Sequence, residues 1–226
     1  MPILAIESAS SDPAVALVEG DAILGVEPAE AGSPGSETLL PAIARLLQGH
    51  DLAIADLEGF AIGIGPGSFT GLRVGLATLK GLAFGDSRPV APVSTLAALA
   101  RLAGAPRPEA VVAALDARRG DAYAALWESG EAPGPVLAES VHRIDDLVAR
   151  LPEHCLWVGD SVGGYPEAAG EGVRAGPAGP CAGQVGLLGV QVLAAGGGLP
   201  AAELVPRYLR RAEAEVQRTG QALEPH

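Results

Sequence analysis

The two halves of this 226-residue chain show the same order of apolar runs and turn residues, and this duplication limits the fold more than any other feature. Each half predicts three strands, then a helix, a strand and a second helix, and the first half continues with one further strand and helix. In the first half, strands are expected at 2–7, 14–19, 22–27, 60–64 and 90–93, and helices at 36–49, about 69–83 and 94–103. In the second half, strands are expected at 111–116, 121–129, 136–142 and 155–158, and helices at 144–151 and 182–195. We therefore expect a duplicated βββαβα fold of the α/β class, with subdomains at 1–105 and 106–212 and a charged tail at 213–226.

Matching residues support the duplication at a constant offset of 109 positions. The pairs are Ala5 with Ala114, Glu7 with Asp116, Asp12 with Asp121, Ala16 and Leu17 with Ala125 and Leu126, and Glu19 with Glu128. The acidic pairs carry the most weight because alanine is common throughout the chain. An acidic residue is therefore expected at the end of the first strand of each half.

The most distinctive segment is GPGSFTGLRVGLATLKGLA, from Gly65 to Ala83. Gly65 and Gly67 allow positive backbone φ, and Ser68 or Thr70 can cap the helix that follows. The segment predicts a strand, a tight turn and a capped helix. Its residue spacing does not match the Walker phosphate loop, the dinucleotide-binding fingerprint or the nucleophile elbow.

The helix in this segment carries both an apolar stripe and small residues. The stripe consists of Leu72, Leu76, Leu79 and Ala83, and the small residues are Gly71, Gly75, Ala77 and Gly81. A glycine inside a helix costs about 1 kcal/mol relative to alanine. Three glycines in this helix therefore indicate close packing, either inside its own domain or against a second chain.

Composition argues against several classes of function. The chain has 27 Asp and Glu against 15 Lys and Arg, a formal charge of −12, so primary binding to nucleic acid is disfavoured. A local basic patch stays open, formed by Arg118, Arg119, Arg207, Arg210 and Arg211. Two cysteines do not make a disulfide framework, and four scattered histidines have no metal-ligand spacing. We expect no metal, no membrane span and a cytoplasmic protein.

Five segments together resemble the bacterial TsaB family, also called YeaZ. They are GPGSFTGLRVGLATLKGLA, SETLLPAI before it, VSTLAALA after it, DARRGDAY at 116–123 and PRYLR ending at Arg210. The resemblance implies the actin, hexokinase and Hsp70 architecture. It also implies a non-catalytic scaffold subunit for making threonylcarbamoyladenosine beside the anticodon of tRNA. Such a subunit binds the catalytic subunit TsaD, is joined by the ATPase TsaE, contacts tRNA only through the complex and forms a homodimer when alone.

The resemblance places the partner interface on the two helices that flank the glycine turn. The residues it implies are Leu39, Leu40, Ile43, Leu47, Gly67, Ser68, Phe69, Thr70, Leu72, Gly75, Leu76 and Leu79. We expect Leu39, Leu40, Ile43, Leu72, Leu76 and Leu79 to be partly exposed in a lone monomer. Gly75→Arg or Leu76→Arg is accordingly expected to abolish association and leave the fold intact. Gly35 stands where the family often has a histidine.

The turn that follows the first strand of each half lies where this architecture holds nucleotide phosphates. We call the turn that begins at Glu7 the first turn and the turn that begins at Asp116 the second turn. A vestigial nucleotide site would use Glu7, Ser8, Ser10, Asp116 and Arg118. The alternative is that both acidic residues only hold the turns by local hydrogen bonds. No cofactor is expected, because the first turn has no glycine and the helix SETLLPAIARLLQ lacks the metal-ligand histidines of TsaD.

Two alternative functions stay open. One is a glycoprotease-like peptidase, which would need Ser68 or a cysteine beside a base. The other is an ATP-dependent small-molecule kinase of the same fold, against which the degenerate phosphate turns argue.

Overall fold

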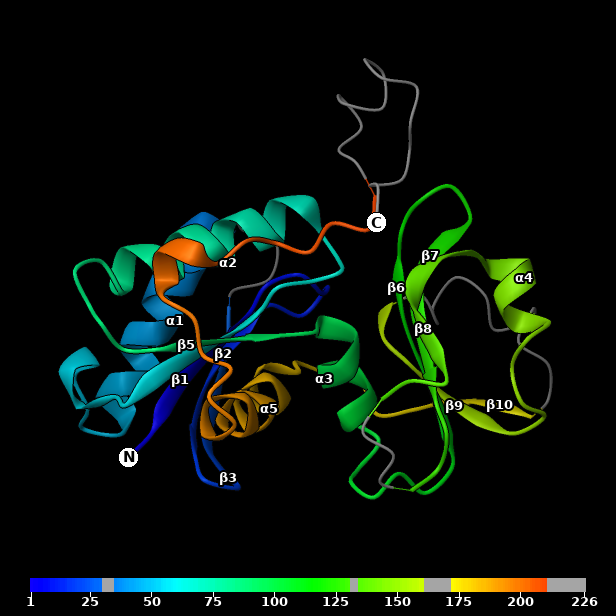
Figure 1. The fold of residues 1–226 in the computed structure, drawn as a ribbon, viewed down its shortest axis with the longest axis horizontal. Helices are drawn as coiled ribbons and strands as arrows, with labels where there is room; N and C mark the ends of the chain where they lie inside the picture. The colour runs from blue at the N-terminus through cyan, green and yellow to red at the C-terminus, as the bar shows by residue number, and fades with distance from the viewer. Residues whose placement is uncertain (30–34, 131–133, 161–171, 211–226) are drawn as a thin grey trace, which may run out of the picture. The chain divides into compact units, whose positions relative to one another are not determined.

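The computed structural model describes residues 1–29, 35–130, 134–160 and 172–210, with the side chains of 35–37 excepted. The first half contains β1 (Ile3–Glu7), β2 (Ala14–Glu19), β3 (Ala22–Pro28), α1 (Gly35–Gly49), the short 3₁₀ helix η1 (Ile54–Asp56), β4 (Gly59–Gly63), α2 (Phe69–Leu82), β5 (Val90–Val93) and α3 (Thr95–Arg101). The second half contains β6 (Ala110–Asp116), β7 (Asp121–Trp127), β8 (Leu137–Arg143), α4 (Ile144–Val148), β9 (Cys155–Val158), β10 (Val173–Ala175), α5 (Ala182–Ala194) and the 3₁₀ helix η3 (Ala201–Glu203) (Figure 1).

The two sheets confirm the duplication at the level of topology. The first has the order β3-β2-β1-β4-β5 and the second β10-β9-β6-β7-β8, so each sheet runs third, second, first, fourth and fifth strand of its half. In each, the first strand pairs antiparallel with the second and parallel with the fourth. The short strand β10, which the sequence pattern did not predict, takes the place that β5 has in the first sheet.

The constant offset of 109 is wrong beyond the first strand of each half. Glu7 pairs with Ala14 in the first hairpin, whereas Asp116 pairs with Ala122 in the second. The second turn is therefore one residue shorter, and β7 corresponds to β2 at an offset of 108. Glu7 and Asp116 keep their equivalence, but the pairs proposed within the second strand are one residue out of register.

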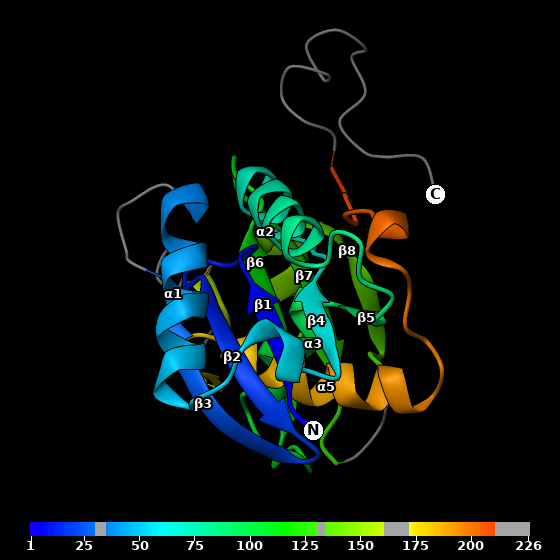
Figure 2. The same cartoon turned by 90° about the vertical axis from the view of Figure 1, so that its left-hand side faces the viewer.

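Helices cover both faces of the first sheet. Helices α1 and α2 lie side by side on one face, and α5 lies on the other (Figure 2). Strand β1 alternates accordingly, since Leu4 and Ile6 belong to the core under α1 and α2, whereas Ala5 faces α5.

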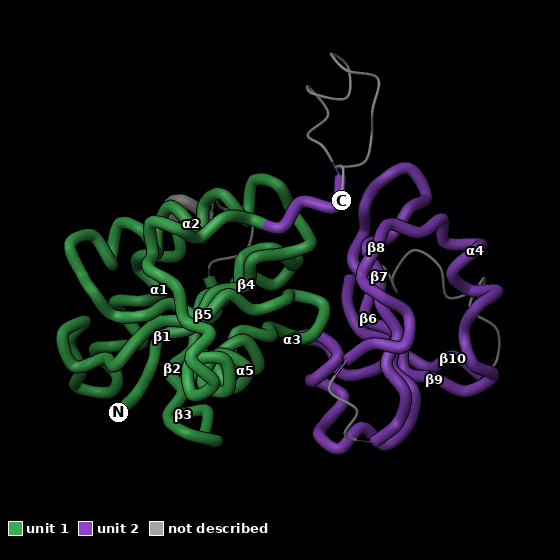
Figure 3. Tube along the Cα trace, viewed as in Figure 1, with its two compact units in different colours: residues 1–98, 179–206 green, residues 99–178, 207–226 purple. Residues whose placement is uncertain are grey.

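The chain divides into two compact units (Figure 3). Unit 1 comprises Met1–Ala98 and Gly179–Pro206, and unit 2 comprises Leu99–Ala178 and Arg207–His226. This division differs from the expected boundary at residue 105, chiefly because α5 returns to unit 1. A Cβ added to Gly186 or Gly189 of α5 would lie 2.3 or 2.4 Å from Val18 or Ala61, so these glycines let the helix pack closely on the first sheet.

No helix within the described part of the chain is both long and apolar enough to cross a membrane. The expected tail at 213–226 lies outside the described residues.

Candidate functional site

The turn between β4 and α2 has the conformation that its glycines predict. Gly65 and Gly67 adopt φ values of 105° and 156°, which confirms the need for glycine at both positions. Ser68 is the N-cap of α2, and its Oγ accepts a hydrogen bond of 3.2 Å from the amide of Gly71. Thr70 lies in the first turn of the helix and is exposed.

The glycine face of α2 packs on the turn between β1 and β2. A Cβ on Gly71 would lie 1.8 Å from the carbonyl oxygen of Ser8, and one on Gly75 would lie 2.2 Å from the Ser8 Oγ. The Ser8 hydroxyl donates to the carbonyl of Gly71 at 2.8 Å, and the amide of Ser68 donates to the carbonyl of Ala9 at the same distance. The close packing indicated by Gly71 and Gly75 therefore occurs inside unit 1, between α2 and the turn that joins β1 to β2.

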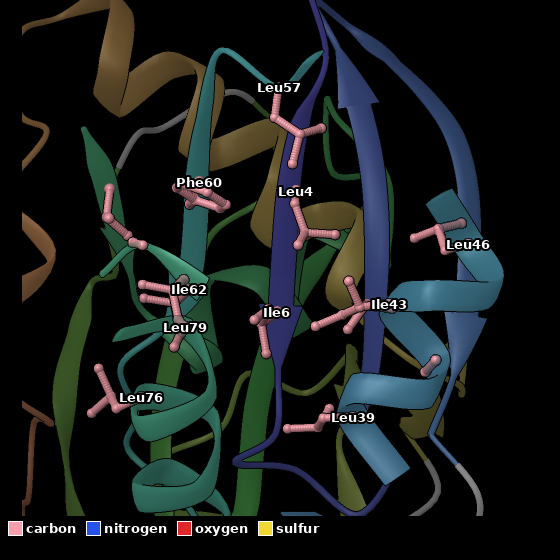
Figure 4. Packing of buried hydrophobic residues seen from close by; sticks show 14 of the residues in the cluster. Leu4, Ile6, Leu39, Ile43, Leu46, Leu57, Phe60, Ile62, Leu76 and Leu79 are labelled. Atoms are coloured by element: carbon pink, nitrogen blue, oxygen red, sulfur yellow. The ribbon is translucent and has the colours of Figure 1, made fainter. Parts of the chain in front are cut away.

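The expected exposure of the leucine stripes is wrong. Five of the six side chains are nearly inaccessible, with exposed fractions of 0% for Leu39, 3% for Ile43, 1% for Leu72, 5% for Leu76 and 0% for Leu79. Leu47 is also buried. Figure 4 shows the labelled members of this set grouped with apolar side chains of β1 and β4. These stripes are buried in the monomer because they cover the first sheet, so Gly75→Arg and Leu76→Arg are now expected to disrupt the fold itself.

The exposed surface of the same two helices lies on the side opposite these stripes. We call it the outer face, and it consists of the exposed residues Leu40, Pro41 and Ala44 of α1 and Thr70, Arg73, Ala77 and Gly81 of α2. Leu40 is 49% exposed and is the one predicted leucine that points outward. The Arg73 guanidinium lies over the half-buried ring of Phe69, 4.6 Å from its centroid. Sequence reasoning missed Pro41 and Ala44 as surface candidates, although the helical period places them opposite the leucines, whereas it did name Ala77 and Gly81 as small residues suited to close packing against a second chain.

The carboxylate of Glu7 lies inside the first turn. The side chain is fully buried, and its Oε1 accepts hydrogen bonds from the amides of Ala9 and Ser10 at 2.5 and 3.2 Å. Its Oε2 accepts one of 3.1 Å from the hydroxyl of Thr95, at the start of α3. A Cβ on Gly63 would lie 1.9 Å from the same Oε2, so β4 leaves room for the carboxylate only because glycine is there. The backbone amides of Ala9 and Ser10, which could otherwise bind a phosphate, already donate to Glu7.

Burial raises the pKa of the Glu7 carboxyl above its ordinary value of 4.5, although the hydrogen bonds from Ala9 and Thr95 oppose the shift. The folded protein thus holds this proton more tightly than the unfolded chain. The contribution of Glu7 to stability is fully present below pH 4.5 and is lost as the pH rises through the raised pKa.

We therefore predict that the isosteric variant Glu7→Gln gains stability relative to the wild type as the pH rises from 4.5. The glutamine oxygen can accept from Ala9 and Ser10, and its amide can donate to Thr95. Urea unfolding of both proteins between pH 4.5 and 8 measures the difference in free energy of unfolding. A difference that stays constant over this range would contradict the raised pKa.

The residues of the second turn lie in unit 2 and also form local hydrogen bonds. The exposed Asp116 accepts from the amide of Arg118 at 2.7 Å, and its own amide donates to Asp160 at 2.9 Å. Arg118, Arg119 and Gly120 have consecutive positive φ values of 68°, 59° and 80°. In both turns, therefore, the acidic residue at the end of the strand forms local hydrogen bonds. Such bonds are the expected alternative to a nucleotide site.

The side chains of Arg207 and Arg210, two arginines of the proposed patch, form contacts within unit 2. Arg207 forms an ion pair with Glu139, and Arg210 contacts both the carbonyl of Ala117 and the carboxylate of Asp121. Arg118 and Arg119 are exposed, and Arg211 lies outside the described residues. Within the PRYLR segment, Arg210 therefore contacts the turn between β6 and β7, and Arg207 contacts β8.

The groups that a peptidase would use have other roles. The Ser68 hydroxyl caps α2, and both cysteines are buried. Burial raises the pKa of Cys155 to about 11, and burial together with nearby Glu7 raises that of Cys181 well above 9. Both thiols therefore stay protonated at neutral pH and are poor nucleophiles.

Comparison with known proteins places this geometry in a family. Residues 17–153 match the family model described as TsaD: tRNA N6-adenosine threonylcarbamoyltransferase. The tRNA threonylcarbamoyladenosine biosynthesis protein TsaB of Escherichia coli is 32% identical over 183 residues, 76% of this chain and 76% of that protein. TsaB of Haemophilus influenzae is 44% identical over 89 residues, which span 39% of this chain and only 38% of the relative.

Solved structures agree with this match. YeaZ from Pseudomonas aeruginosa superposes with a TM-score of 0.76 at 28% identity, covering 92% of this chain and 99% of that one. An activator of 2-hydroxyisocaproyl-CoA dehydratase from Clostridium difficile, with a TM-score of 0.56 and 11% identity over 87% of this chain and 97% of that one, shows the actin-like fold alone. The sequence match over most of the chain and the shared fold together establish that the chain belongs to the TsaB (YeaZ) family.

Proposed function

We propose that the protein is a non-catalytic subunit in the formation of threonylcarbamoyladenosine in tRNA, and that it acts by binding a TsaD-type threonylcarbamoyltransferase. The observation that carries this proposal is the match to TsaB of Escherichia coli over three quarters of both chains. The match of residues 17–153 to the TsaD family model supports a common architecture for this chain and the proposed partner.

The chemistry of the first turn supports a scaffold rather than an ATP-dependent kinase. In unit 1, Glu7 accepts from the amides of Ala9 and Ser10, and α2 packs directly on Ser8. A phosphate at this turn would have to displace a buried carboxylate and the start of a helix. The same contacts instead hold α2 rigidly, which suits a helix that presents a binding surface.

The outer face of α1 and α2 is the surface we assign to TsaD, or to a second copy of this chain when TsaD is absent. It combines the half-exposed Leu40 with small residues such as Ala44, Ala77 and Gly81, over which a partner helix could pack closely. The ATPase TsaE would join the pair. With a formal charge of −12, the subunit would meet tRNA only through the assembled complex, in the cytoplasm.

Reconstitution tests this function. The isolated protein is expected to form no threonylcarbamoyladenosine on tRNA, because the Glu7 turn and the buried thiols offer no reactive group. Addition of TsaD and TsaE, with ATP and threonylcarbamoyl-adenylate, should give the modified nucleoside, measured by mass spectrometry of digested tRNA. The matched control omits only this chain from the mixture. Product from the chain alone, or full product without it, would refute the proposal.

A further inference from the structure

The buried carboxylate of Glu7 lies where three elements of unit 1 meet. It ends β1, it receives a hydrogen bond from Thr95 at the start of α3, and Gly63 of β4 leaves space for its Oε2. Its remaining hydrogen bonds come from the amides of Ala9 and Ser10. An uncompensated carboxylate at such a position would be costly, so these donors and the carboxylate fix one another.

Helix α2 packs on the turn that Glu7 stabilises. The amide of Ala9 donates to Glu7, and the carbonyl of Ala9 accepts from Ser68, the N-cap of α2. The hydroxyl of Ser8 donates to the carbonyl of Gly71 in the first turn of the helix. A continuous chain of hydrogen bonds therefore runs from the Glu7 carboxylate through Ala9 to Ser68 and on to the amide of Gly71.

Tight packing leaves this connection little freedom. A Cβ at Gly67, Gly71 or Gly75 would come within 2.4 Å of Ala9 or Ser8 atoms, so a small movement of the turn must move α2 as well. Helix α2 carries Arg73, Ala77 and Gly81 of the outer face.

We infer that the Glu7 carboxyl group, through its hydrogen bonds to the first turn and to Thr95, positions α2, and with it the outer face, for the protein partner. Glu7 is thus a positioning residue, and its effect on partner binding rests on the proposed function. Its effect on α2 does not, because that effect is a property of unit 1 alone.

The experiment compares the full chain with Glu7→Ala, Glu7→Gln and Val185→Ala. Val185 is a fully buried residue of α5, on the other face of the sheet, and controls for a general loss of core packing. Amide hydrogen exchange of residues 68–74 is measured first, without any partner. We expect exchange at least ten-fold faster in Glu7→Ala, and rates close to wild type in Glu7→Gln and Val185→Ala.

Affinity for TsaD, measured by titration calorimetry, is the second readout. Glu7→Ala should bind at least ten-fold more weakly, whereas Glu7→Gln should stay within about three-fold of wild type because it preserves the hydrogen bonds. Exchange at 68–74 that is unchanged in Glu7→Ala, or equally raised in Val185→Ala, overturns the inference. If the wild type itself fails to bind TsaD, the proposed function fails, and the exchange result still decides whether Glu7 positions α2.

Should Glu7→Ala not fold, Thr95→Val supplies a milder test, since it removes only the hydroxyl that donates to Glu7 Oε2. It should raise exchange at 68–74 a few-fold. No change in that segment would count against the inference in the same way.

Discussion

Gly71→Ala should destabilise the protein by about 3 kcal/mol, the upper part of the range for overpacking a rigid core. The new methyl group would lie 1.8 Å from the carbonyl oxygen of Ser8, and the neighbouring atom is backbone that cannot rotate away. Helix α2 must then move off the first turn and lose the hydrogen bond between Ser8 and the Gly71 carbonyl. Urea unfolding followed by circular dichroism measures the loss.

Gly81→Ala in the same helix is the matched control. A Cβ at Gly81 would meet nothing within 4 Å, so the substitution should only gain helix propensity, about 0.5 to 1 kcal/mol. If both variants unfolded at the same urea concentration, the close approach of α2 to Ser8 would be disproved.

Leu76→Arg should lose more free energy of unfolding than Gly71→Ala, because it places a charge in a site that is 5% exposed.

The sequence predicted the order of elements and the glycine turn because both depend on local patterns. Three apolar runs with turn residues determine the first hairpins, and Gly65, Gly67 and Ser68 determine the entry into α2. The sequence did not predict that α5 joins unit 1, because a helix with glycines on one face specifies close packing but not the sheet it packs on. Strand β10, with only three residues, is too short to give a period.

For the candidate site, the sequence predicted the two helices but not the direction in which their apolar faces point. The leucine periodicity of α1 and α2 correctly indicates two amphipathic helices, yet it is the same whether the apolar face covers the chain's own sheet or a partner. Glu7 was recognised as the residue at the first turn, whereas its partner Thr95 lies 88 positions away and carries no local signal. The interface itself stays a prediction, now moved to the outer face.

Ala77→Arg should abolish association with TsaD, and with a second copy of this chain, while leaving the fold intact. Ala77 is exposed in the middle of α2, so the longer side chain extends into solvent in the monomer. An interface of ordinary size buries about 1,600 Å², and a micromolar complex has only about 8 kcal/mol of binding free energy. A bulky, unpaired charge at its centre should cost about 3 kcal/mol or more, which lowers the affinity at least 100-fold.

Ala194→Arg is the control for this prediction, because Ala194 is also an exposed helical alanine but lies at the end of α5, on the opposite face of the first sheet. Circular dichroism and urea unfolding should show both variants to be as stable as wild type. Titration with TsaD and size-exclusion chromatography should then separate them, with Ala194→Arg binding normally and Ala77→Arg not at all. Normal binding by a folded Ala77→Arg would exclude the outer face, and loss of binding by both would show that charge alone, rather than the place of the arginine, weakens the complex.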